Sequence, residues 1–132
     1  MAQKLAKGVE LLDEVVGEGL VAEKGSMVTY NARFFLRRGD EVTQDGETIS
    51  RVRDHVATRI IGGVELIDHV TELGKHRPIS GVEISLYGMR KHGYREVLVA
   101  PHLAYGQAGV PDLVPSNALL RIQLWVQDVR AT

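Results

Sequence analysis

The sequence predicts an α+β fold in which several strands accompany one short helix. With 132 residues, of which 44% are hydrophobic and 25% charged, the chain has the size and composition of one globular domain. Apolar and polar residues alternate in residues 27–36 and 118–129, as they do in strands with one buried face. A helical spacing of three and four appears in residues 79–89. We therefore expect a single domain over residues 1–132.

The N-terminal part is predicted to contribute two strands. Residues 8–16 fit an edge strand, and the glycines of residues 17–25 indicate a loop. Residues 27–36 are rich in β-branched and aromatic side chains, which favours a strand. Residues 37–40 should end that strand in a solvated turn, and Asp45-Gly46 is typical of a hairpin turn.

Residues 49–69 allow more than one interpretation. Residues 52–61 fit either a pair of strands or a strand beside a loop, and Gly62-Gly63 indicates a break. The stretch holds more apolar residues than a plain turn needs. It could therefore cover an exposed sheet edge or contact another protein.

A short helix is predicted over residues 79–89. Four apolar residues share one face at this spacing: Ile79, Val82, Leu86 and Met89. Ser80 and Glu83 fit a capping box, and Gly88 is placed to end the helix. The basic residues that follow, within 90–95, are favoured at a helix C-terminus by the helix dipole.

Two strands with a long loop between them are predicted to complete the chain. Residues 94–99 form the first strand and residues 118–129 the second. The alternating apolar residues of the second strand are Leu120, Ile122, Leu124 and Val126. The intervening residues 100–117 contain several prolines and glycines, and loops of this length within small domains are usually functional.

Composition excludes several functional classes. The chain has no cysteine, so it forms no disulfide and offers no thiolate to a metal or a substrate. A net charge of −1 and an aromatic content of 5% argue against nucleic-acid binding. Neither a signal peptide nor a membrane-spanning apolar run is apparent, so we expect a cytoplasmic protein without a membrane partner. The five histidines are scattered, and we expect no metal site and no cofactor.

The C-terminal half carries a specific set of motifs. They are Leu73-Gly74-Lys75, Ile79 with Gly81, Gly88-Met89, Gly93, Arg95, Pro101, Leu103-Ala104-Tyr105-Gly106, Gly109, Pro111, Val114-Pro115 and Asn117-Ala118. This run resembles the FKBP-type peptidyl-prolyl cis-trans isomerases. The N-terminal half resembles the family more loosely, through Gly17-Glu18-Gly19, Gly25, Tyr30 and Gly39. The resemblance is interrupted by an inserted segment within about residues 43–69.

The resemblance implies an antiparallel sheet of about five strands wrapped around one short helix. A pocket would lie between helix and sheet, with residues 100–117 at its rim. In such a pocket the Tyr105 hydroxyl and the Ile79 backbone N–H would each donate to a carbonyl of the substrate or of a macrolide. Tyr30 would line the pocket, and Val110 and Val114 would lie on its rim.

The sequence departs from the family at several expected pocket positions. Val82 stands where the family has the tryptophan of the pocket floor, and Val42-Thr43 replaces a Phe-Asp pair. Ile122 stands where the last strand has phenylalanine. The resemblance therefore implies an aliphatic and wider pocket, with weak macrolide binding and reduced or altered activity.

Three functions are consistent with these residues. The first is an isomerase of X-Pro bonds that acts on proline-containing peptides or unfolded protein chains. The second is a protein-binding or chaperone module of the same fold that has lost efficient catalysis. An enzyme of unrelated chemistry ranks last, because no general base is apparent near Tyr105. Tyr105 could also simply pin its loop, and Tyr30 could simply belong to the core.

Overall fold

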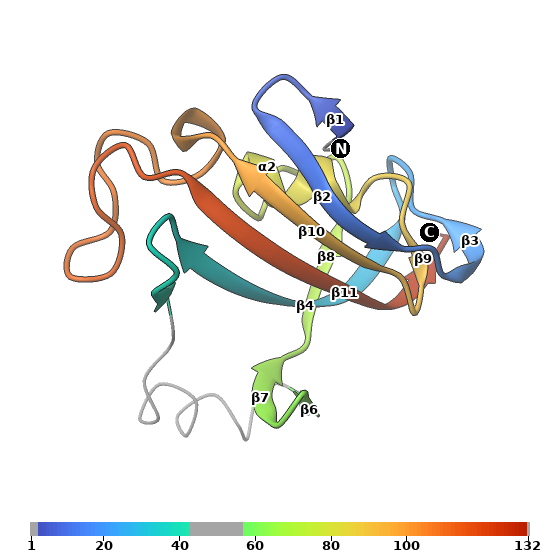
Figure 1. The fold of residues 1–132 in the computed structure, drawn as a ribbon. Coiled ribbons are helices and arrows are strands. Elements are labelled where there is room, and N and C mark those ends of the chain that lie inside the picture. The colour runs from blue at the N-terminus through green and yellow to red at the C-terminus, as the bar shows by residue number, and fades with distance from the viewer. Residues whose placement is uncertain (1–2, 43–56, 132) are drawn as a thin grey trace.

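A computed structural model describes residues 3–42 and 57–131 as an α+β fold dominated by antiparallel strands (Figure 1). The strands are β1 (Gln3–Ala6), β2 (Val9–Val15), β3 (Glu18–Val21), β4 (Met27–Leu36), β5 (Glu41–Val42), β6 (Thr58–Ile61), β7 (Val64–Ile67), β8 (His69–Glu72), β9 (Arg90–Lys91), β10 (Tyr94–Val99) and β11 (Leu120–Arg130). The helix is α2 (Ser80–Leu86), and a 3₁₀ turn spans Pro101–Leu103. The predicted fold class is thus confirmed.

The main sheet has seven strands, two more than the predicted number. Its order is β1-β2-β10-β11-β4-β5, and β8 pairs with β4 beyond the end of β5. Strand β11 lies between β10 and β4, so its alternating residues reach the middle of the core. Leu120, Ile122, Leu124 and Val126 are all fully buried, as their period of two predicts.

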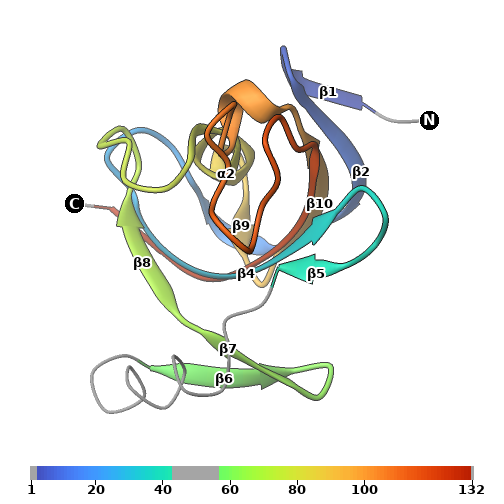
Figure 2. The same ribbon diagram turned by 90° about the vertical axis from the view of Figure 1, so that its left-hand side faces the viewer.

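Helix α2 lies in the concave face of this curved sheet, with residues 100–117 at the open side (Figure 2). The predicted apolar face is confirmed for Val82 and Leu86, which are buried in the same core as the strands. The helix is shorter than the predicted residues 79–89, so the buried Met89 lies beyond its end. Gly81 also faces this core. A Cβ added to Gly81 would lie 2.2 Å from Cγ1 of Val99 on β10, so the helix can approach the sheet this closely only with glycine there.

The predicted capping box is wrong. Ile79 is the N-cap of α2, and no described side chain caps this N-terminal end of the helix. The carboxylate of Glu83 is buried and turns instead to the preceding loop, where it accepts hydrogen bonds from the backbone N–H of Gly74 at 2.8 Å and of His76 at 3.3 Å. These hydrogen bonds stabilise the buried carboxylate, which needs donors, and also the backbone N–H groups of the loop, which need an acceptor. Glu83 ties this loop to the helix.

The other end of α2 is capped by Arg95 of strand β10. Its guanidinium donates to the backbone carbonyls of Ser85 at 2.9 Å and Tyr87 at 2.7 Å, and it pairs with Glu14 of β2 at 2.7 Å. A cation is favoured at a helix C-terminus, as predicted for this basic stretch. Arg90 behaves differently, because it lies in β9 and donates to the carbonyl of Gly19.

Strand β2 is not the edge strand that the sequence predicts. It pairs with β10 on one side and with β1 on the other, so β1 covers part of its free edge. Strand β1 was not predicted, because four residues are too few for the period-two pattern to be recognised.

A hairpin of β6 and β7 projects from the sheet within the predicted insertion (Figure 1). Gly62 and Gly63, both at positive φ, form its turn and connect two strands instead of breaking the structure. The fully buried Asn31 of β4 anchors it: the amide donates to the carbonyl of Ile67 at 2.8 Å and to Asp68 at 2.6 Å. Arg59 holds Asp68 through both carboxylate oxygens. The predicted Asp45-Gly46 turn lies outside the described residues.

Candidate binding pocket

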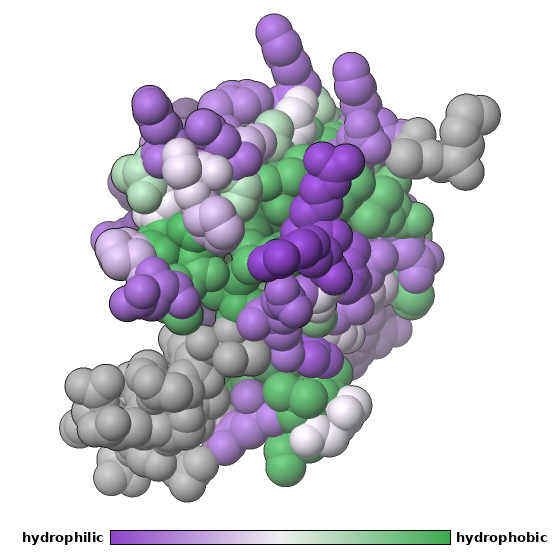
Figure 3. Space-filling view, turned by 60° about the vertical axis from the view of Figure 1, so that its left-hand side comes forward, coloured by the Kyte–Doolittle hydropathy of each residue, from purple (hydrophilic) through white to green (hydrophobic). Residues whose placement is uncertain are grey.

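A pocket of about 400 Å³ lies between β4, β8, the start of α2 and the loop of residues 100–117. Its lining combines apolar side chains with polar ones that are uncharged or basic: Tyr30, Phe34, His69, Val70, Thr71, Arg77, Pro78, Ile79, Val82 and Tyr105. Figure 3 views the side on which that loop lies and shows a band of apolar residues between hydrophilic ones. Four of the eight predicted site residues therefore come together in one pocket.

Two phenols face this pocket. Tyr30 on β4 is buried in the core, and Tyr105 of the loop is half-buried. Neither hydroxyl forms a hydrogen bond within the part of the chain that the structure describes, so Tyr105 is not seen to pin its loop through its hydroxyl. Burial raises the pKa of Tyr30 to about 12, with a further contribution from Tyr105, and burial also raises the pKa of Tyr105. Both phenols are therefore hydrogen-bond donors at neutral pH.

Ile79 places a backbone donor at the same pocket. As the N-cap of α2, its carbonyl accepts from the N–H groups of Val82 and Glu83. Its own N–H donates to none of the described residues. An unpaired N–H beside a pocket is ready to bind a carbonyl oxygen, because backbone amides seldom remain without a partner.

The loop that carries Tyr105 is held by its own backbone. Gly106 donates to the carbonyl of Pro101 at 2.8 Å, and Gly109 donates to that of Tyr105 at 3.0 Å. At Gly109 φ is +62°, and a Cβ would lie 2.3 Å from the carbonyl oxygen of Val114. Glycine is thus required for the turn. The loop is preorganised, so Tyr105 keeps its place without a bound ligand.

The remaining predicted site residues lie elsewhere. Val110 and Val114 form an isolated bridge in the rim loop and line a separate hollow of about 350 Å³. Val42 on β5 pairs with Phe34, and Ile122 is fully buried on β11 opposite the same Phe34. None of these four lines the pocket of Tyr105, and their binding roles stay predictions. Thr43 lies outside the described residues.

Four polar or aromatic lining residues were not predicted as site residues: Phe34, His69, Thr71 and Arg77. His69 stacks on Tyr30, with ring centroids 5.2 Å apart. Loss of solvent contact lowers the pKa of His69 below its ordinary value of 6.5, although the neighbouring Asp68 opposes this shift. The ring is therefore neutral at pH 7. The pairing of β8 with β4 brings His69 and Thr71 here, and nothing in the sequence predicts that register.

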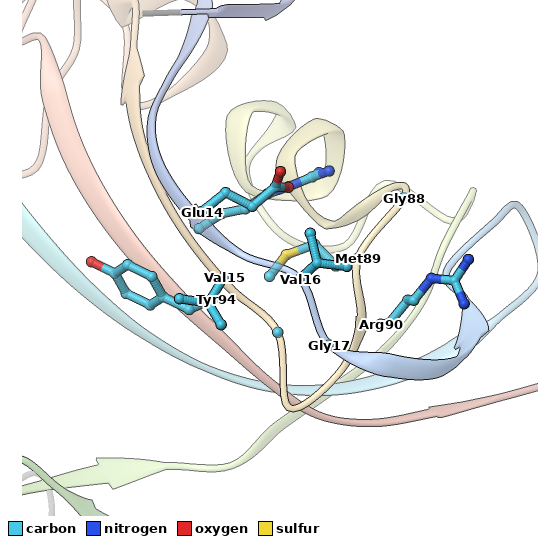
Figure 4. Close-up of a pocket in the computed structure, with 10 residues that line it drawn as sticks. Glu14, Val15, Val16, Gly17, Gly88, Met89, Arg90 and Tyr94 are labelled. Carbon is cyan, nitrogen blue, oxygen red and sulfur yellow. The ribbon is translucent and has the colours of Figure 1, made fainter.

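A second cavity, of about 30 Å³, lies on another part of the sheet and has room for about one water molecule. Figure 4 shows it between the end of β2 and the chain that leaves α2, lined by Glu14, Val15, Val16, Gly17, Gly88, Met89, Arg90, Gly93, Tyr94 and Arg95. It is too small for a peptide. The described ranges contain no group of three or more residues that could hold a metal ion. Within the same ranges no helix is long and apolar enough to cross a membrane.

The raised pKa of Tyr30 predicts a loss of stability at alkaline pH. An unfolded tyrosine ionises near pH 10, whereas Tyr30 in the folded protein keeps its proton to about pH 12. Above about pH 10 the unfolded state therefore binds fewer protons, and stability falls as the pH rises. Urea unfolding at pH 8 and about pH 11 should show a smaller alkaline loss for Tyr30→Phe than for the parent protein. Equal losses would contradict burial of this phenol.

The fold and the pocket together define an FKBP-like domain: an antiparallel sheet curved around one short helix, with a pocket between them. Solved structures of this fold agree. FkpA from Escherichia coli matches with a TM-score of 0.71 and 23% identity over 98% of this chain and 52% of its own. The N-terminal domain of FKBP42 from Arabidopsis thaliana has the same TM-score with 20% identity, and the match covers 98% of this chain and 91% of that chain.

Sequence comparison identifies the family to which this chain belongs, in addition to its fold. The family model described as FKBP-type peptidyl-prolyl cis-trans isomerase matches residues 20–124. The chain belongs to this family. It is 29% identical to the chloroplastic peptidyl-prolyl cis-trans isomerase FKBP16-4 of Arabidopsis thaliana, over 96% of this chain and 50% of that protein. It is 27% identical to the 46 kDa FK506-binding nuclear protein of Spodoptera frugiperda, over 97% of this chain and 27% of that protein. The chain thus spans about half or less of these curated relatives.

Proposed function

We propose that the protein is a peptidyl-prolyl cis-trans isomerase that acts on X-Pro bonds of peptides or unfolded chains. The observation that carries this proposal is the pocket itself, in which an apolar wall faces two phenols and a backbone N–H without partners among the described residues. An apolar wall can hold the proline ring. The donors can hold the carbonyls on either side of it.

The reaction needs no nucleophile, general base or metal. Its barrier of about 18–20 kcal/mol comes from amide resonance, which is lost when the bond twists. A twisted amide carries less charge on its carbonyl oxygen than a planar one, so a water-poor pocket favours it. Tyr105 and the N–H of Ile79 would fix the flanking carbonyls while the bond between them rotates.

Val82 sets the expected level of activity. It lines the pocket and is fully buried, and the family resemblance assigns it the position at which relatives carry the tryptophan of the pocket floor. A valine offers less surface to a proline ring than an indole, and it lacks an aromatic face. We propose that activity and macrolide binding are both weak for this reason.

Exchange NMR on a short Leu-Pro or Phe-Pro peptide, with substoichiometric protein, tests the proposal. Cis/trans exchange should exceed the uncatalysed rate. Tyr105→Phe should lower kcat/KM about fivefold, because one hydrogen bond to the substrate is lost. Val82→Trp should raise it several-fold, since the pocket has room for an indole.

The matched control for Tyr105→Phe is Tyr87→Phe, because Tyr87 follows α2 and does not line the pocket. This control should leave exchange unchanged. Equal losses from both variants would show that the effect is on the fold and would count against the site.

The binding module is a second candidate, and the observation that favours it is the aliphatic floor at Val82. Under this alternative the peptide resonances would shift on addition of protein without faster exchange, and Val82→Trp would not restore catalysis. Such a result would exclude the isomerase proposal and leave the pocket as a peptide-binding site.

A further inference from the structure

One residue that lines the pocket has a buried hydroxyl with no partner in the described part of the chain. Thr71 is only 4% exposed, and its Oγ1 accepts from and donates to none of the residues that the structure describes. Buried hydroxyls are almost always hydrogen-bonded, so such a group calls for an explanation. Thr71 lies two residues from His69 on β8 and therefore shares its sheet face, on which His69 stacks against Tyr30. Thr71 thus belongs to the pocket wall, and its hydroxyl lies just beneath the accessible surface of that wall.

The mouth of the pocket carries a positive charge that no described carboxylate pairs with. Its loop holds three basic residues in a row, and two of them have acidic partners: Lys75 lies 3.7 Å from Glu72, and His76 lies 2.9 Å from Glu83. The third, Arg77, is exposed, lines the pocket and has no carboxylate within ion-pair distance in residues 3–42 and 57–131. Since Glu83 ties the loop to α2, Arg77 is presented from an anchored segment.

All the polar side chains of this wall can donate hydrogen bonds. They are the hydroxyls of Tyr30, Thr71 and Tyr105, the imidazole of His69 and the guanidinium of Arg77. None of the described residues that line the pocket is a carboxylate. A wall of donors, with a guanidinium that has no acidic partner among the described residues, is complementary to an anion rich in acceptor oxygens.

We propose that this wall makes the pocket selective for X-Pro sequences in which the residue before the proline carries an oxyanion, a carboxylate or a phosphate. The inference rests on the proposed function and names its substrate class. Arg77 attracts the anion at the mouth. The Thr71 hydroxyl, which has no partner among the described residues, donates to the anion when the bound peptide reaches this part of the wall.

The test compares four peptides that differ only before the proline: Leu, Gln, Glu and phosphoserine. Dissociation constants come from chemical-shift titration, and kcat/KM comes from exchange NMR on the same samples. The Glu peptide should bind about fivefold more tightly than its Gln isostere at low salt, as expected for one charge-assisted contact that is partly exposed. The ratio should fall as salt is added. The phosphoserine arm distinguishes the two oxyanions: tighter binding than Glu assigns the site to phosphate.

Two variants test which residues cause the preference for the Glu peptide over the Gln peptide. Arg77→Gln should reduce the Glu-to-Gln ratio to about one, whereas Arg38→Gln, at an exposed arginine outside the pocket, should leave the ratio unchanged. Thr71→Val has nearly the same shape, and because the hydroxyl loses no hydrogen bond to any residue in 3–42 or 57–131, the variant should fold normally. It should also lower the ratio, and the effect should persist at high salt.

The outcomes separate this inference from the proposed function. Faster exchange on every peptide with a Glu-to-Gln ratio of one would overturn the selectivity and leave the isomerase standing. Selective binding without faster exchange would overturn the isomerase and support the oxyanion subsite. No binding of any peptide would overturn both.

Discussion

Replacing Asn31 by aspartate is expected to destabilise the protein by about 4 kcal/mol at pH 7. Asn31 is fully buried, and its amide nitrogen donates to Ile67 and, at 2.6 Å, to Asp68. The substitution keeps the shape but replaces this donor by an oxygen. It therefore places a second carboxylate against Asp68 and leaves the carbonyl of Ile67 without its partner. Urea unfolding measures the loss.

The pH dependence of this loss identifies its cause. Burial and the charge of Asp68 would raise the pKa of the new carboxyl group above that of the unfolded chain, near 3.9. The penalty should then grow as the pH rises above about 4 and be smaller at pH 5 than at pH 7. Asn117→Asp, the same change at an exposed position, should cost little at either pH. A penalty independent of pH would mean that the lost hydrogen bonds of the amide, not the new charge, are responsible.

Replacing Gly81 by alanine is expected to destabilise the protein by about 3 kcal/mol, although alanine is the better helix former by about 1 kcal/mol. The new Cβ would lie 2.2 and 2.9 Å from the two methyl carbons of Val99 and 3.1 Å from the carbonyl oxygen of Leu103. Helix α2 would have to move away from the sheet. Ile79 and Val82 lie at the start of this helix and line the pocket, so they would move with it. The kcat/KM of isomerisation should therefore also fall.

A double-mutant cycle checks this account of Gly81. Val99→Ala alone creates a cavity in the core, but it also removes the methyl groups that oppose the new Cβ. The two changes together should therefore cost clearly less than the sum of the single changes. Ser80→Ala, at the exposed neighbouring position, should have little effect. Strict additivity would exclude the contact with Val99 as the cause.

The periodicity of apolar residues predicts those elements that have one buried face and one more exposed face. Strand β11 and helix α2 each present one buried apolar face. The alternation of apolar residues in β11 and their spacing of three and four in α2 are both visible in the sequence alone. Tyr30, Ile79, Val82 and Tyr105 are likewise expected in one pocket, because the family motifs carry them. For these elements the sequence contains the signal in full.

What could not be predicted depends on contacts between one element and another. Glu83 has the spacing of a capping residue, yet the loop of Gly74 and His76 offers it better-placed donors. Thr71 and His69 join the pocket through the register of β8 against β4, which no local pattern encodes. Such contacts join residues of different elements, and local propensity does not report them.

The pairing of β4 with β11 has a consequence for how the chain acquires its fold. It joins segments about 90 residues apart, so a large loop must close before the central strands meet, and folding should take milliseconds to seconds. On a ribosome that adds about 5–20 residues per second, β4 would wait roughly 5–20 s for its main partner. The shorter β5 and β8 would reach it earlier. During that interval the future core face of β4 would be open to solvent and to other nascent chains.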